Sequence, residues 1–198
     1  PMDTLHTATF RLNSILYVAF LGLAWGLWER MPDRYPGHMS LGGEVTRWAE
    51  GPGEWILLVA LCSITFGKMH LFQRFVVVDP DTQLLNVPHK KAFQRLPRER
   101  RIPVIRRANR MLGFLNSGTL ATFALLMTLV YLAATHPGSI TVPLANGALI
   151  LVLVLLVVIP VAEALAMGRM IRRKLEEEGI PLTDSTEGDG HSHGGSTR

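Results

Sequence analysis

Four long stretches with almost no charged residues constrain this chain more than any other feature of its sequence. They cover residues 12–28, 55–72, 111–134 and 144–168, and strongly charged segments separate them. A helix of about 20 apolar residues crosses the roughly 30 Å hydrocarbon core of a bilayer. Backbone amides find no water inside lipid, so each stretch is expected to be helical. The sequence therefore predicts an all-α membrane protein built as a four-transmembrane-helix bundle.

The predicted membrane domain occupies residues 1–174, and residues 175–198 form a polar tail that contains histidines. A mean hydropathy of +0.24 and 48% hydrophobic residues are too apolar for an ordinary soluble domain of this size. The tail ends in GDGHSHGGSTR, a composition that favours disorder. His191 and His193 lack the defined geometry of a metal site, so we favour a flexible tail without bound metal.

The distribution of lysine and arginine predicts how the helices are oriented. Ten of the 20 basic residues lie between residues 74 and 110, and residues 135–143 contain none. Because cytoplasmic loops carry the basic excess, both termini are expected in the cytoplasm and residues 29–54 outside. Five aromatic residues then fall at the outer face, as headgroup-level aromatics should: Trp25, Trp28, Trp48, Trp55 and Tyr131. Because the basic residues lie beside the apolar stretches, the net charge of +4 indicates contact with a lipid bilayer and not with nucleic acid.

The segment after the second stretch predicts further structure on the cytoplasmic side. Residues 75–78 and 83–87 read as two short strands around an Asp-Pro-Asp-Thr turn, which predicts a small cytoplasmic β-hairpin. Between residues 96 and 110, arginines alternate with apolar residues, as in an interfacial helix. We favour attraction to anionic lipid over a protein or nucleotide site for this basic segment.

Four polar residues inside the predicted spans form the first candidate site: Lys68, His70, Asn116 and Glu163. Polar groups are costly in lipid, which makes them candidates for function. Lys68 and Glu163 lie equally far from the cytoplasmic ends of their helices, so an ion pair between them is geometrically allowed. Asn13, Ser14 and Ser117 are expected to join this cluster in the cytoplasmic half of the bundle.

Other arrangements of the same residues stay open. Lys68 can extend its amine to the inner headgroups, and Glu163 can meet Arg169 or water near the end of its helix. A pathway for protons or ions is a third interpretation of the cluster.

The second candidate site is the predicted outer loop, residues 31–48, with the sequence MPDRYPGHMSLGGEVTRW. Its prolines and glycines impose turns, which predicts a structured loop. Seven of its residues match a motif: Pro32, Asp33, Pro36, His38, Gly43, Glu44 and Trp48. Through them the chain resembles the bacterial and archaeal membrane family called domain of unknown function 1648. The resemblance implies a multi-pass membrane protein, and some relatives carry this domain within immunity proteins against a secreted toxic peptide.

His38 lies near Asp33 and Glu44 in this loop, which raises the question of a metal or ligand site. One histidine and two carboxylates provide few preorganised ligands. We therefore favour a histidine that is hydrogen-bonded within the turns of the loop, and no metal.

Two functions of different classes follow from these patterns. The first is a non-catalytic accessory, interaction or immunity-like protein of the inner membrane, which meets a protein partner through the outer loop or the basic cytoplasmic segment. The second is a small transporter or ion-coupled protein that uses the Lys68 and Glu163 cluster, and it would need oligomerisation because four helices enclose little volume. No GxSxG, HExxH, CxxC or P-loop pattern occurs, so neither an enzyme nor a cofactor is predicted.

Overall fold

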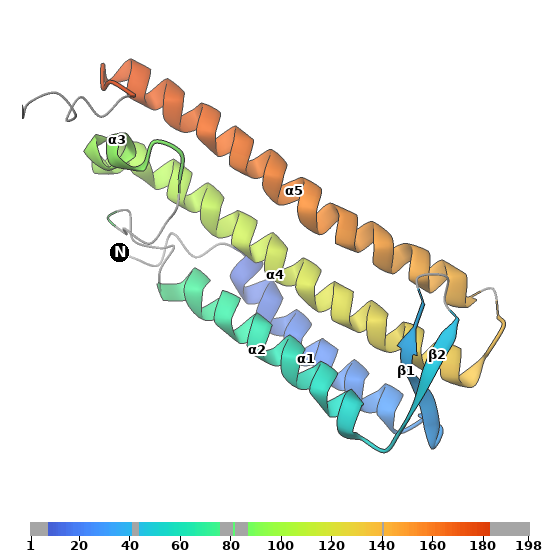
Figure 1. Cartoon of the computed structure of the whole chain (residues 1–198). Helices are drawn as coiled ribbons and strands as arrows, with labels where there is room; N and C mark the ends of the chain where they lie inside the picture. Colours follow the sequence, from blue (N-terminus) through green and yellow to red (C-terminus); the bar gives the residue numbers. More distant parts are fainter. Residues whose placement is uncertain (1–7, 41–43, 76–80, 82–86, 140, 183–198) are drawn as a thin grey trace, which may run out of the picture.

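The computed structural model of the chain describes residues 8–40, 44–75, 81, 87–139 and 141–182 (Figure 1). Its elements follow the order α1 (Ala8–Trp28), β1 (Arg34–Met39), β2 (Val45–Glu50), α2 (Gly53–Phe75), α3 (Lys90–Arg95), α4 (Arg98–Thr135) and α5 (Thr141–Glu177). The two strands lie at one end of the helices and α3 lies at the other (Figure 1). We call these the hairpin end and the basic end.

The four predicted helices are confirmed as helices. Each of α1, α2, α4 and α5 is long and apolar enough to cross a membrane. With 38 and 37 residues, α4 and α5 are far longer than the roughly 20 residues that a span needs. Their additional turns are at the basic end, where the arginines of α4 and α5 are found.

The helix α4 lies at the centre of the molecule, with α1 and α2 packed on one side and α5 along the other (Figure 1). Gly118 permits the close approach of α5, because a Cβ atom there would overlap the side chain of Leu156. The middle of α5 presents a row of exposed apolar side chains, which includes Leu151, Val154, Val157 and Val161. The helices therefore form an open arrangement around α4.

The predicted outer loop is structured, and its structure is a β-hairpin. Strands β1 and β2 pair antiparallel, with Tyr35 opposite Ala49 and Pro36 opposite Trp48. The register is irregular on both sides of His38, so that Gly37 has no direct partner, which is the signature of a β-bulge. The β-branched and aromatic residues of β2 favour an extended backbone, a feature that the prediction of a structured loop did not include.

The structure tests only one end of the β-hairpin predicted after the second helix. Phe75, expected to begin its first strand, is instead the last residue of α2. Residues 76–80 and 82–86, which hold most of both predicted strands, lie outside the described residues.

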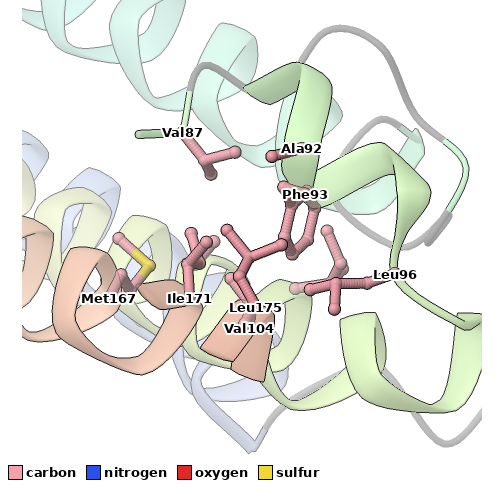
Figure 2. Packing of buried hydrophobic residues seen from close by; sticks show 10 residues of the cluster. Val87, Ala92, Phe93, Leu96, Val104, Met167, Ile171 and Leu175 are labelled. Carbon is pink, nitrogen blue, oxygen red and sulfur yellow. The ribbon is translucent and has the colours of Figure 1, made fainter. Parts of the chain in front are cut away.

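At the basic end, α3 packs against α4 and α5 around a buried apolar cluster (Figure 2). Phe93 from α3, Val104 and Ile105 from α4, and Ile171 and Leu175 from α5 are all at most 4% exposed. The helix predicted over residues 96–110 is confirmed for residues 98–110, and it leads without a break into the third span. Residues 98–110 are the first turns of α4, and their apolar side chains face other helices because α5 extends far enough to cover them.

Candidate functional site

The hairpin is anchored on the helices through Tyr35, whose side chain is only 2% exposed. Its hydroxyl donates a hydrogen bond to the carbonyl oxygen of Gly51 at 2.9 Å. Its ring meets Trp28 and Trp55 edge-on, with centroids 6.2 and 6.4 Å away. Trp55 in turn donates its indole N–H to the carbonyl oxygen of Ala24 at 3.2 Å, which links α2 to α1. Burial raises the pKa of Tyr35 above its usual value.

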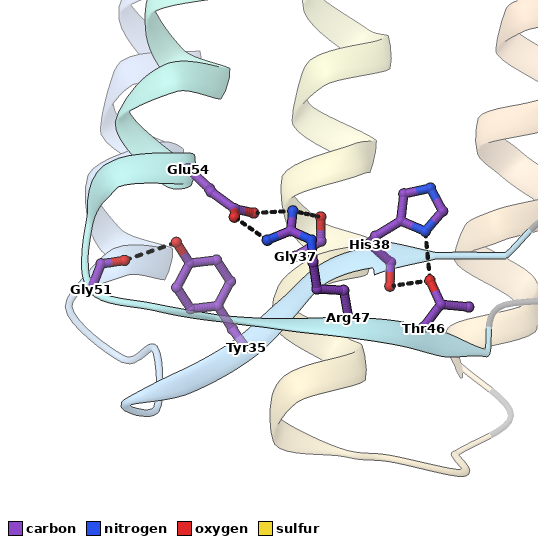
Figure 3. A network of polar contacts seen from close by, with 7 residues as sticks. All are labelled: Tyr35, Gly37, His38, Thr46, Arg47, Gly51 and Glu54. Atoms are coloured by element: carbon purple, nitrogen blue, oxygen red, sulfur yellow. Dashed lines mark hydrogen bonds and ion pairs between the residues drawn. The ribbon is translucent and has the colours of Figure 1, made fainter.

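A second contact joins β2 to the beginning of α2 (Figure 3). The guanidinium of Arg47 donates from both terminal nitrogens to the carboxylate of Glu54, and Nη2 also donates to the carbonyl oxygen of Gly37 at 3.1 Å. The hydrogen bond to Glu54 raises the pKa of Arg47. Glycine suits position 37, because a Cβ atom there would lie 2.7 Å from Oε2 of Glu54 and 3.0 Å from Cβ of Ala49, so that the ion pair would have to shift. The bulge in β1 thus makes room for this ion pair.

A pocket of about 540 Å³ opens between the hairpin and the helices α2, α4 and α5; we call it the hairpin pocket. Five residues with polar groups are among its lining: His38, Ser40, Arg47, Glu54 and Asn146. Apolar side chains line the remainder, among them Leu57, Leu58, Leu126, Leu129, Val130 and Leu149. Ligand pockets in proteins are typically about 300–1,000 Å³ and mostly apolar with a few polar groups, as this one is.

The structure distributes the seven motif residues unequally around this pocket. Pro36 is buried and lines it together with His38, whereas Trp48 is half-exposed on β2. Pro32, Asp33 and Glu44 are exposed, and Gly43 lies outside the described residues.

His38 has the hydrogen-bonded role that we favoured from the sequence. Its Nδ1 lies 2.5 Å from Oγ1 of Thr46, which itself donates to the carbonyl oxygen of His38 (Figure 3). Among the described residues, no group of three His, Cys, Asp or Glu side chains is placed to hold a metal ion.

Four amide side chains are fully buried nearer the basic end: Asn13 of α1, Gln73 of α2, and Asn109 and Asn116 of α4. We call them the buried amide layer. Asn13 donates to the carbonyl oxygen of Gly113 at 2.8 Å and accepts from the hydroxyl of Ser117 at 2.5 Å. Three hydrogen bonds of 3.0 to 3.2 Å join Gln73 and Asn109. These bonds hold α1 and α2 on α4 through polar groups.

Asn116 differs from the other amides of the layer. Within the described part of the chain, neither its Oδ1 nor its Nδ2 has a hydrogen-bond partner. His70 stacks on Phe10, with centroids 3.9 Å apart, and its Nε2 lies 3.4 Å from the hydroxyl of Ser14. Buried amide atoms without partners are rare in proteins, so Asn116 is the most unusual member of the predicted polar cluster.

The expected pair of Lys68 and Glu163 does not form. Glu163 instead accepts a 2.5 Å hydrogen bond from Nε of Arg107, and both side chains of this pair are 27% exposed. Lys68 is exposed on α2. Of the arrangements that the sequence left open, the ion pair is absent because α4 lies between α2 and α5, so that the basic residue opposite Glu163 comes from α4.

Several residues of these sites were not identified from the sequence. Gln73 and Asn109 lie just beyond the predicted spans, which we ended at residues 72 and 111, although both helices continue through them. The sequence signal that could have identified them is an uncharged amide residue beside arginines at the end of an apolar helix. Arg47 and Glu54 carried no local signal, because the hairpin alone brings them together.

Comparison with protein-family models, curated proteins and solved structures found no match. The resemblance to the domain of unknown function 1648 family therefore rests on the loop residues alone.

Proposed function

We propose that this chain is a multi-pass protein of the cell inner membrane that spans the bilayer with α1, α2, α4 and α5. The hairpin end faces outward, and both termini are cytoplasmic. Two observations support this arrangement. The apolar side chains along the middle of α5 are exposed, which lipid accommodates and water does not. Arginine and lysine are concentrated at the basic end, as in cytoplasmic segments.

Cysteine labelling in intact cells tests this orientation. Cys62 is buried and is first replaced by alanine, which leaves a chain without cysteine. A maleimide that does not cross membranes should then label Ser40→Cys at the hairpin end. It should leave Lys90→Cys and Arg172→Cys at the basic end unlabelled until the cells are opened. Labelling of the basic end alone in intact cells would refute the proposed orientation.

We further propose that the protein is a non-catalytic accessory protein and that the hairpin pocket binds an amphiphilic segment of a partner protein. The observation that carries this proposal is that both apolar and polar side chains line the pocket. Leucines of α2, α4 and α5 offer a site for an apolar side chain, and Arg47, Glu54 and Ser40 offer hydrogen bonds. Half-exposed Trp48 on the same hairpin adds an aromatic contact of the kind enriched at protein interfaces.

The anchoring of the hairpin favours recognition of this kind. Tyr35 and the Arg47–Glu54 pair attach both strands to the helices, so the pocket exists before a partner arrives. A preformed site avoids the entropy cost of ordering a loop during binding. The resemblance to a family that includes immunity proteins supports an immunity-like role as one form of this function.

Site-specific photocrosslinking in native membranes tests this function. A photoreactive amino acid at Ser40 or Leu126 lines the hairpin pocket, whereas one at Val157 lies on the exposed face of α5. We expect one discrete crosslinked product from the two pocket positions and none from Val157. Asn146→Trp, which fills the pocket, should abolish the product, and the neighbouring Gly147→Trp, in open space, should not. The same products at all three positions would contradict the proposal.

The amide of Asn116, which meets no partner in the described ranges, favours a second function, that of a small ion-coupled transporter. An unsatisfied buried amide is a site that a water molecule or an ion can complete. The expected charged pair does not support this function, because Glu163 is bound to Arg107. Flux into proteoliposomes that disappears in Asn116→Leu but persists in the pocket variant Asn146→Trp would favour transport over accessory binding.

A further inference from the structure

Six basic side chains line a groove between α4 and α5 at the basic end: Arg100, Arg107, Arg169, Arg172, Arg173 and Lys174. We call it the basic groove, and its volume is about 670 Å³. We propose that the basic groove binds the phosphate of an anionic phospholipid. This site lies at the opposite end of the molecule from the hairpin pocket and is independent of the partner proposed there.

Three of the six cations already have carboxylate partners. Arg100 pairs with Glu177 at 3.2 Å and with Glu178 at 2.9 Å. Arg107 holds Glu163, and Arg172 pairs with Glu176 at 3.0 Å within α5. These ion pairs fix the side chains that form the walls of the groove.

The other three cations, Arg169, Arg173 and Lys174, form no ion pair with any residue that the structure describes. Arg169 and Arg173 are four residues apart on α5 and so share one face of the helix, where two like charges repel. An anion between them removes this repulsion. Guanidinium groups match phosphate in geometry because they donate two parallel hydrogen bonds.

The position of the groove identifies a lipid as the source of this phosphate. Leu165, one turn before Arg169, is 63% exposed and ends the exposed apolar face of α5. Ala166 and Met170 continue this apolar surface into the groove itself. An acyl chain can therefore lie along α5 while its phosphate reaches Arg169 and Arg173. This choice of source rests on the proposed membrane insertion, which places the groove at the headgroups of the cytoplasmic leaflet.

Lipid retention by the purified full chain tests the proposal. Native mass spectrometry would compare binding of phosphatidylglycerol with that of phosphatidylcholine from mixed micelles. We expect Arg169→Gln/Arg173→Gln to weaken phosphatidylglycerol binding by at least about tenfold, because two charge-assisted contacts are lost. Arg98→Gln/Arg106→Gln is the matched control, since it removes the same charge from exposed residues of α4 outside the groove. It should change binding by less than about twofold, as expected from general electrostatic attraction alone.

A second variant separates the shape of the site from its charge. Ala166→Trp obstructs the groove without altering any charge and should also lower phosphatidylglycerol retention. Equal loss in the groove variant and the control variant would overturn the proposal, as would equal retention of the two lipids by the wild type. Inorganic pyrophosphate that displaces phosphatidylglycerol and binds in its place would assign the groove to a soluble anion and overturn the lipid source.

Failure of the lipid-site proposal can be distinguished from failure of the proposed function. Cysteine labelling judges membrane orientation, and photocrosslinking judges the hairpin pocket. A groove variant that keeps the wild-type labelling pattern and crosslinks, in a protein that shows no preference for phosphatidylglycerol, would overturn the lipid site alone.

Discussion

Three hydrogen bonds join Gln73 and Asn109, so replacing either residue should weaken the contact that holds α2 on α4. Both side chains are fully buried, and the two amides share the 3.0 Å hydrogen bond from Nε2 of Gln73 to Oδ1 of Asn109. Gln73 also donates to the backbone carbonyl of Asn109, and Asn109 donates to that of Gln73. The perturbation we consider is Gln73→Leu, Asn109→Leu and the double replacement.

The expected free energies follow from these bonds. Each single replacement removes two of the three hydrogen bonds, which costs about 1–3 kcal/mol in free energy of unfolding. The bond from Nε2 of Gln73 to Oδ1 of Asn109 is lost in each single variant, but the double variant loses it only once. The double variant should therefore cost less than the sum of the two. Coupling between polar side chains in membrane proteins averages about 0.6 kcal/mol and reaches about 1.7, and we expect a value near the upper end.

Reversible unfolding in mixed micelles of a mild detergent and dodecyl sulfate measures these three free energies. Asn116→Leu provides a control in the same layer, because its amide has no described partner to leave unsatisfied and should show no coupling to Gln73→Leu. A coupling below about 0.3 kcal/mol between Gln73 and Asn109 would mean that the two replacements act independently. That result would refute the assignment of the buried amide layer as a bonded network.

Three further changes test other contacts. Gly37→Ala should destabilise the hairpin by about 1–3 kcal/mol because its Cβ would overlap Glu54, whereas Gly53→Ala, in open space, should be neutral; equal thermal stability of the two variants would contradict the fit. Burial raises the pKa of Tyr35, so the stability that its neutral hydroxyl provides is full below about pH 10 and is lost as pH rises through the folded-state pKa. Tyr35→Phe should therefore reduce the loss of thermal stability at alkaline pH, and an unchanged alkaline profile would refute this. Glu163→Gln should lower the free energy of unfolding by about 1–2 kcal/mol because its ion pair with Arg107 is lost, and Lys68→Gln should lower it by less than about 0.5. Similar costs of the two changes in a denaturation assay would instead favour the Lys68–Glu163 pair that the sequence allowed.

The order of the helices was predictable because it depends on local composition. A stretch of about 20 residues without charge specifies a helix of membrane-crossing length wherever it occurs in a chain. The predicted spans accordingly fall inside α1, α2, α4 and α5. A hydrogen-bonded His38 was also predicted, although the hydroxyl that it meets belongs to Thr46 on the paired strand β2 and not to a turn.

The ends of the helices were less predictable than their centres. The predicted third stretch begins at residue 111 because arginines precede it, yet α4 begins at Arg98. Arg98, Arg106 and Arg110 are exposed while Val104 and Ile105 are covered by α5, so the helix continues beyond its apolar part. Whether such a segment faces lipid or protein depends on the length of its neighbour, which the segment itself does not encode.

The sequence by itself determined which long apolar segments are helical and which ends carry the basic residues, but it did not predict the short helix α3. Only the tertiary structure decided that Glu163 meets Arg107 and not Lys68, that Arg47 reaches Glu54, and that the amides converge on α4. The physical reason is that helix formation and hydropathy are properties of neighbouring residues along the chain. The partner of a polar side chain depends on which helix lies beside it, and here α4 separates α2 from α5.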